Sequence, residues 1–255
     1  MKMKIIKIED TACIKSLCSG IEETMVYSCL QGCMGTIYAT EDLKSVQLSI
    51  ADFCFFLGVP SKELLKNKVW GDFVIIYLQN QSWEDNIKEI YPAVREHIRY
   101  ATKKNENHFD ILALKFNIQS LPSKYVLKAI DEEVYHQVIS QQWSYDLCSQ
   151  FKTAEEFVNR GIGFVVMDDY EVIAGASSYT IYNEGIEIEI DTRKDKRRQG
   201  LARVCASQII LACLEKGIYP SWDAHNTASL DLAVSLGYVF DKEYKVYELS
   251  IKELL

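Results

Sequence analysis

The stretch GIEIEIDTRKDKRRQGLA, residues 185–202, contains two different patterns in succession. In residues 186–191 isoleucine alternates with an acidic residue, which predicts a β-strand with one apolar and one acidic face. The acidic residues are Glu187, Glu189 and Asp191. From Gln199 onward the apolar residues recur at helical spacing, so a helix is expected to begin there. The stretch therefore predicts a strand, a basic turn and an amphipathic helix.

The turn between this strand and helix is densely cationic; its basic residues are Arg193, Lys194, Lys196, Arg197 and Arg198. Main-chain N–H groups at the start of a helix can bind a pyrophosphate, and neighbouring cations add charge-assisted contacts. Gly200 would let the main chain approach such a group closely, and the small Ala202 keeps the first helical turn uncrowded. The turn alone is equally compatible with an ordinary solvated loop.

The composition and net charge of the chain exclude several classes of protein. The chain has 255 residues, of which 48% are hydrophobic and 25% charged, which indicates packed domains rather than disorder and a length that suits two of them. The longest apolar stretches are strand-sized, and the first ten residues lack the features of a signal peptide. We therefore expect a cytoplasmic protein without a membrane partner. The net charge of −8 argues against a nucleic-acid partner.

Eight cysteines are spread along the chain without a CxxC pair, which favours reduced thiols over a disulfide framework. The one cluster comprises Cys13, Cys18, Cys29 and Cys33. Its spacing is compatible with a zinc site, but the same spacing on helices describes small core residues. We expect no bound metal.

The second half of the chain predicts a mixed α/β fold. The order is strand, two helices, three strands, helix, strand, helix and two closing strands, with Thr153 and Glu156 forming a capping box. The expected ranges are 125–130, 131–142, 153–161, 163–167, 172–182, 186–192, 199–217, 218–223, 226–236, 238–240 and 244–250.

The first half predicts a similar order of elements. The expected ranges are 4–8, 11–19, 22–31, 35–40, 45–50, 52–57, 61–66, 73–78, 83–96, 98–102 and 111–116. This similarity indicates a diverged internal duplication. We expect one domain over residues 1–117 and another over residues 122–255, joined by a linker at 117–124 that contains Pro122.

The second half resembles the GCN5-related N-acetyltransferase (GNAT) superfamily. Its acetyl-CoA motif is Arg or Gln, two residues, Gly, one residue, then Gly or Ala, and it is matched by Arg197, Gly200 and Ala202. A second family feature is matched by Asn226, Ser229, Leu232, Gly237 and Tyr238. The resemblance covers residues 122–255 and implies the GNAT fold there. For residues 1–117 it rests on element order alone, which suggests a degenerate GNAT-like copy.

Two further stretches, GIEIEIDT at 185–192 and PSWDAHN at 220–226, look like a bacterial branch of the superfamily that includes zwittermicin A resistance-type acetyltransferases. This narrower resemblance implies transfer of an acetyl group to an amine.

The resemblance implies acetyl-CoA as co-substrate. In the family the pantetheine arm lies along the strand before the basic turn, which corresponds here to the main chains of Ile190 and Thr192. The pyrophosphate would then lie against Arg197, Arg198, Gln199, Gly200, Leu201 and Ala202. Asn226 is expected either to hydrogen-bond the pantetheine arm or to act as a helix N-cap.

Acetyl transfer to an amine benefits from a base, because an alkyl ammonium has a pKa of about 10.4. Glu187 and Glu189 are the candidates, since family members often carry a general-base glutamate on this strand. The alternative is that these acids face solvent on a half-exposed strand. The family's usual tyrosine acid, seven residues after the asparagine, is replaced here by Ala233, so the acid is not assigned.

These observations predict an N-acetyltransferase that acts by direct attack of a small, cationic amine on acetyl-CoA. One alternative is a non-catalytic module that binds or senses acyl-CoA. Another is a protein acetyltransferase or an interaction protein with a decayed site. The oligomeric state is left open, a homodimer included.

Overall fold

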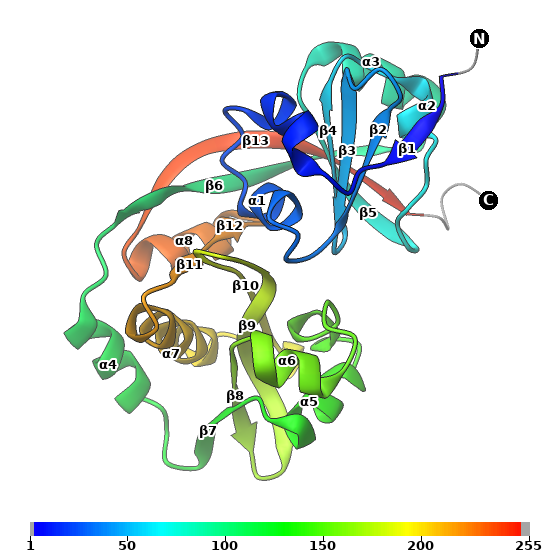
Figure 1. The fold of residues 1–255 in the computed structure, drawn as a ribbon. Helices are drawn as coiled ribbons and strands as arrows, with labels where there is room; N and C mark the ends of the chain where they lie inside the picture. The colour runs from blue at the N-terminus through cyan, green and yellow to red at the C-terminus, as the bar shows by residue number, and fades with distance from the viewer. Residues whose placement is uncertain (1–2, 251–255) are drawn as a thin grey trace. The chain divides into compact units, whose positions relative to one another are not determined.

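The computed structural model describes residues 3–250, with the side chain at position 106 left out. The chain forms two compact units, shown in Figure 1. Unit 1 contains the described residues up to Arg99 and those from Glu243 onward, and unit 2 contains Tyr100–Lys242. Two long strands, β6 (Arg95–Asn107) and β13 (Tyr238–Ser250), carry the chain from one unit into the other.

Unit 2 is built on a five-stranded sheet in the order β11-β10-β9-β8-β7. Neighbouring strands are antiparallel except β10 and β11, which are parallel. Its elements are α4 (Ile111–Gln119), β7 (Tyr125–Ala129), α5 (Glu132–Ile139), the 3₁₀ helix η2 (Tyr145–Leu147), α6 (Ala154–Arg160), β8 (Gly163–Asp168), β9 (Glu171–Tyr182), β10 (Gly185–Thr192), the 3₁₀ helix η3 (Lys194–Lys196), α7 (Leu201–Glu215), β11 (Tyr219–Ser221), β12 (Asp223–Ala224) and α8 (Thr227–Ser235).

Helices cover both faces of this sheet. Figure 1 shows α7 on one side and α5 with α6 on the other. Ile186 and Ile188 of β10 pack in the same apolar cluster as α7, whereas Val165 and Met167 of β8 pack with α5, η2 and α6. The strands are therefore buried on both faces, which positions β10 rigidly between two layers.

Unit 1 contains a second sheet, in which β1 to β5 are neighbours in chain order and the end of β13 lies beside β5. Its elements are β1 (Ile5–Lys7), the 3₁₀ helix η1 (Thr11–Cys18), α1 (Thr24–Leu30), β2 (Thr36–Thr40), β3 (Ser45–Ile50), β4 (Phe53–Gly58), α2 (Lys62–Leu65), β5 (Phe73–Leu78) and α3 (Gln81–Ile90). Trp83, Ile87 and Phe56 belong to its core.

The two units share one order of elements. Each has a strand, helices, a three-stranded antiparallel meander, a helix and a strand parallel to the one before it. The duplication predicted from the sequence agrees with this observed order. The mixed α/β class is also confirmed.

The unit boundaries differ from those expected at residues 117–124. That segment lies inside unit 2, where residues up to Gln119 belong to α4, and the last strand returns to unit 1. The predicted strand over residues 111–116 is wrong: the segment is helical because the Asp110 side chain accepts hydrogen bonds from the N–H groups of Leu112 and Ala113.

Three further ranges need correction. The helix expected over 83–96 begins earlier and ends at Ile90, since Asn80 caps its start. The two strands expected at 238–240 and 244–250 form one strand, β13. The strand expected at 218–223 is split into β11 and β12.

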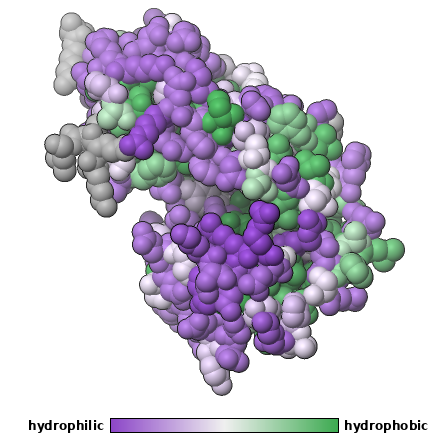
Figure 2. Space-filling view, turned by 180° about the vertical axis from the view of Figure 1, so that it is seen from behind, coloured by the Kyte–Doolittle hydropathy of each residue, from purple (hydrophilic) through white to green (hydrophobic). Residues whose placement is uncertain are grey.

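The surface carries one apolar helix face. In α4 the side chains of Leu112 and Phe116 are 78% and 70% exposed, and Figure 2 shows hydrophobic residues gathered over this helix.

Among residues 3–250, no helix has both the length and the hydrophobicity needed to cross a bilayer.

Candidate functional site

One edge of strand β10 is open along most of its length. β10 pairs with β9 from Gly185 to Thr192, but with β11 only from Gly185 to Glu187. β11 then ends, and the next short strand, β12, pairs with β6 instead. Within the described residues no strand covers positions 188–192 on this side. No neighbouring strand therefore competes with an extended ligand for the main-chain groups along this edge.

Alternation identifies which main-chain groups face the open edge. The N–H of Arg193 donates to the carbonyl oxygen of Ile173 in β9 at 2.9 Å. In an antiparallel pair alternate residues bond to the same neighbour, so Ile190 and Thr192 direct their N–H and C=O groups the other way. The Thr192 carbonyl accordingly accepts a hydrogen bond from Arg197 Nε at 3.1 Å.

A β-bulge lies where β10 and β11 separate. The pairing with β9 shifts between Glu187, opposite Thr180, and Ile188, opposite Ser178. Tyr179 is consequently the additional residue on β9. Bulges twist a strand and re-aim its groups, so the bulge adds to the opening of this edge.

The acidic face of β10 is turned toward η2 and not toward open solvent. Opposite Asp191 lies Gly175, where a Cβ atom would meet Leu147 of η2 at 2.6 Å. Glu187 is only 4% exposed, and Glu189 and Asp191 are half-buried. The alternative of a solvent-facing acid is therefore wrong for Glu187, whereas Glu189 and Asp191 keep partial contact with solvent.

Asp191 is the acid whose protonation the fold changes most clearly. Burial raises the pKa of its carboxyl from 3.8 to about 6, with a smaller upward contribution from Asp146, while the Thr192 N–H and Arg197 lower it. The sequence predicts Asp191 only as an acidic neighbour of Glu187 and Glu189. Its place on the same strand face as the two glutamates is the sequence signal that would have marked it as a candidate site residue.

The start of α7 forms an anion-binding geometry. Arg198 and Gly200 both adopt positive φ, at 63° and 80°, and Gly200 is the N-cap of a 15-residue helix without a side-chain cap. The first N–H groups of α7 thus lack the capping hydrogen bond that most helices have. Such a turn, together with the helix dipole, favours a bound anion.

The basic turn divides into paired and available cations. Arg193 forms ion pairs with Glu171 and Asp195 at 2.7 and 2.8 Å, and Lys196 with Asp168 at 2.7 Å. Along the described chain, Lys194, Arg197 and Arg198 form no ion pair. These three cations remain available to a phosphate group.

The remaining residues predicted to contact the pyrophosphate are Gln199, Leu201 and Ala202. Gln199 accepts a hydrogen bond from the Tyr125 hydroxyl at 3.2 Å. The Leu201 side chain is buried, at 2% exposed, so this residue could contact a ligand only through its main-chain N–H. Ala202 is half-buried.

Asn226 is the N-cap of α8, because its side-chain oxygen accepts from the Ser229 N–H at 2.9 Å. Its amide nitrogen can still act as a donor. Ala233 is fully buried in the apolar cluster of unit 2, so a side chain at this position belongs to the core.

Two members of the cysteine cluster are held as neutral thiols. Cys18 and Cys29 are buried, and burial raises the pKa of both thiols, that of Cys18 to about 11. Cys13 is exposed and Cys33 half-buried.

In the described part of unit 1, the strand edge equivalent to that of β10 is not open. β4 pairs with β5 from Phe53 to Phe56, and the Gln79 N–H adds a bond to the Phe56 oxygen. The Gly58 N–H donates to Gln79 Oε1 at 2.7 Å. The following helix, α2, has only four residues, and Ser61 caps it. Beside β4, the strand of unit 1 that corresponds to β10, the equivalent opening is therefore closed by hydrogen bonds to Gln79.

Comparison with known proteins identifies the family of this chain. The family model described as GNAT acetyltransferase matches residues 15–247. The uncharacterized N-acetyltransferase YdfB of Bacillus subtilis (strain 168) is 28% identical over 244 residues, covering 88% of this chain and 89% of that protein. The crystal structure of a GCN5-related N-acetyltransferase-like protein from Streptococcus suis 89/1591 has 42% identity and a TM-score of 0.89, covering 94% of this chain and 98% of that one.

A tandem GNAT protein from the clavulanic acid biosynthesis pathway superimposes with a TM-score of 0.57 at 10% identity, covering 98% of both chains. That likeness shows the fold alone, and it agrees with two units of one element order. Since the family model extends through both units, the protein belongs to the GNAT acetyltransferase family and is an acyltransferase.

Proposed function

We propose that unit 2 binds acetyl-CoA as the acetyl donor. The pantetheine arm would lie along the open edge of β10, against the main chains of Ile190 and Thr192. Its two amide groups can pair with a strand edge as a peptide does. The pyrophosphate would lie at the start of α7, from Arg197 to Ala202, and Asn226 would donate to the arm.

One observation carries this proposal: the open edge and the uncapped helix start are separated along the chain only by the basic turn. An extended ligand with a phosphate at one end can thus contact both. Lys194, Arg197 and Arg198 add positive charge where the phosphates would lie.

We further propose that the acceptor is the amine of a small cationic molecule. The acidic face of β10 begins beside the bulge, where the acyl group would end. Glu187 or Glu189 would accept a proton from the amine nitrogen as its lone pair forms the bond to the acyl carbon. The carbon–sulfur bond then breaks, and its electron pair leaves on the sulfur of CoA. Negative side chains also favour a cationic acceptor.

Calorimetric titration with acetyl-CoA tests the donor, with desulfo-CoA as a positive control and ATP as a specificity control. We expect CoA species to bind and Gly200→Asp to weaken binding at least about tenfold, since it places a negative charge beside the phosphates. Arg193→Gln is the matched control, because Arg193 is already paired. Failure to bind at millimolar acetyl-CoA would overturn the proposal.

Turnover with polyamines, amino sugars and amino antibiotics tests the acceptor. Glu187→Gln and Glu189→Gln should leave acetyl-CoA affinity unchanged, and the variant that lacks the base should lose at least about a hundredfold in kcat. Full turnover in both variants would remove the base assignment. Binding without turnover on any amine would favour the acyl-CoA sensing alternative.

A further inference from the structure

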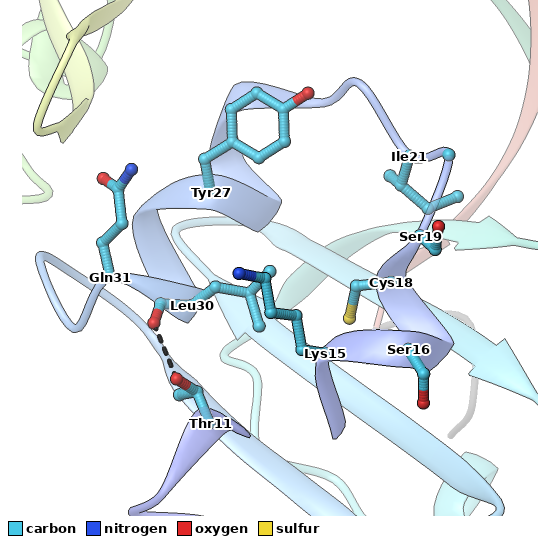
Figure 3. Close-up of a pocket in the computed structure, with 10 residues that line it drawn as sticks. Thr11, Lys15, Ser16, Cys18, Ser19, Ile21, Tyr27, Leu30 and Gln31 are labelled. Atoms are coloured by element: carbon cyan, nitrogen blue, oxygen red, sulfur yellow. Dashed lines mark hydrogen bonds between the residues drawn. The ribbon is translucent and has the colours of Figure 1, made fainter. Parts of the chain in front are cut away.

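Unit 1 contains a pocket of its own, with a volume of about 700 Å³. Figure 3 shows it between η1 and α1, and the residues that line it in the described structure all belong to one continuous segment, residues 11–31. Its volume lies in the range of pockets that hold drug-sized molecules.

Local hydrogen bonds and burial fix the two walls of the pocket. The Thr11 hydroxyl donates to the Leu30 carbonyl at 2.9 Å, which ties the start of η1 to the end of α1. Ile14 and Cys18 anchor η1 in the core, at 0% and 6% exposed. Gly20, at φ 79°, makes the turn between the two helices. The pocket is therefore a feature of the packed structure and not of a loose loop.

The lining is apolar on several sides and has a single charged side chain. Ile21, Leu30, the ring of Tyr27 and the neutral thiol of Cys18 supply the apolar surface. Lys15 is the charged residue among those lining the pocket, and within the described chain its side chain forms no ion pair or hydrogen bond. In Figure 3 its side chain reaches toward the end of α1. No carboxylate belongs to the described lining.

We propose that this pocket is a binding site for a small molecule with an apolar body and one anionic group, a carboxylate or a sulfonate. The apolar walls would bury the body, and the Lys15 ammonium would pair with the anion. The residues that line this site belong to unit 1, whereas those of the proposed acetyl-CoA site belong to unit 2, so each site can be tested by variants in its own unit.

Two fluorescent dyes with the same ring system test the proposal on the full chain. 8-Anilino-1-naphthalenesulfonate carries one negative charge, and N-phenyl-1-naphthylamine carries none. We expect both to bind, the sulfonate more tightly. Lys15→Gln should weaken the sulfonate about threefold to tenfold and leave the neutral dye unchanged. Ile21→Asn should weaken both dyes, because it removes part of the apolar wall.

Three controls separate this pocket from other surfaces. Lys66→Gln alters another exposed lysine of unit 1 and should change neither dye. Leu112→Gln with Phe116→Gln removes the apolar face of α4 and should leave the effect of Lys15→Gln intact. Saturating acetyl-CoA should not displace the sulfonate dye, and Gly200→Asp should not weaken it.

The proposal is overturned by any of three results. These are no saturable binding of either dye, equal loss of both dyes in Lys15→Gln, or loss of the sulfonate dye only in the α4 or Gly200 variants. The α4 and Gly200 variants change residues of unit 2. If acetyl-CoA does not bind there, the effect of Lys15→Gln on the sulfonate dye still decides this proposal.

Discussion

Arg197 Nε donates a hydrogen bond to the carbonyl oxygen of Thr192 at 3.1 Å. The bond joins the first residue of the RxxGxA motif to the last residue of β10, so it holds the basic turn against the end of the open strand. The neighbouring Arg198 has φ 63° and no hydrogen bond or ion pair within the described chain. The two adjacent arginines therefore differ in role: Arg197 both positions the turn and contributes charge, whereas Arg198 contributes charge alone.

This difference predicts different responses of acetyl-CoA binding. Arg197→Lys keeps the charge but loses the Nε donor, so affinity should fall about threefold to tenfold with an unchanged dependence on salt. Arg198→Gln removes only charge, so its effect should be largest at low salt and should shrink as ionic strength rises. Calorimetry at 50 and 300 mM salt checks both. Identical salt profiles for the two variants would contradict this assignment.

A proline substitution tests which main-chain groups of β10 bind the donor. The N–H of Ile190 faces the open edge, so Ile190→Pro removes a donor without breaking a bond to β9. We expect acetyl-CoA to bind at least about tenfold more weakly to Ile190→Pro than to Ile190→Ala, the control for the lost side chain. The free energies of unfolding of the two variants should agree within about 1 kcal/mol. Equal affinities would exclude the edge as the binding surface.

Two glycines at left-handed positions predict stability effects of different size. Gly200→Ala should cost about 1 kcal/mol, because a Cβ there meets no atom within 4 Å and only the backbone conformation is strained. Gly58→Ala should cost about 3 kcal/mol, since its Cβ would also collide with the Lys44 carbonyl oxygen. Urea unfolding measures both. Equal costs would show that Lys44 moves aside freely.

Local patterns made much of unit 2 predictable. β10 was expected over 186–192 and is observed over Gly185–Thr192, because alternation needs only the strand's own residues. The Thr153 hydroxyl accepts from the Glu156 N–H at 3.1 Å, as the capping box predicted. The helix at residues 111–116 was not predictable from its own residues, because their apolar side chains fit neither period clearly and the decisive group, Asp110, lies just outside the stretch.

The site was predictable in composition but not in arrangement. The basic residues of the turn were visible, yet the partners that neutralise two of them include Asp168 and Glu171, which lie more than twenty residues earlier in the chain. The separation of β10 from β11 likewise depends on where β12 pairs. Both features follow from contacts between distant segments, which local spacing does not encode.

Asp191 predicts a pH dependence of stability. Its carboxyl has a pKa of about 6 in the folded chain against an ordinary 3.8, so the folded state binds the proton more tightly than the unfolded state. The free energy of unfolding should therefore fall as pH rises from about 4 to 6, because ionisation then leaves a charge in a partly buried position.

Asp191→Asn removes that ionisation. It should be more stable than the natural chain at pH 8, by about 1 to 2 kcal/mol once partial solvent exposure is allowed for, and the advantage should vanish near pH 4. Urea unfolding at both pH values measures the difference. Asp146→Asn, which removes a smaller contribution to the same shift, should give a smaller change of the same sign. An advantage of Asp191→Asn that is equal at both pH values would mean that packing, and not the charge, is responsible.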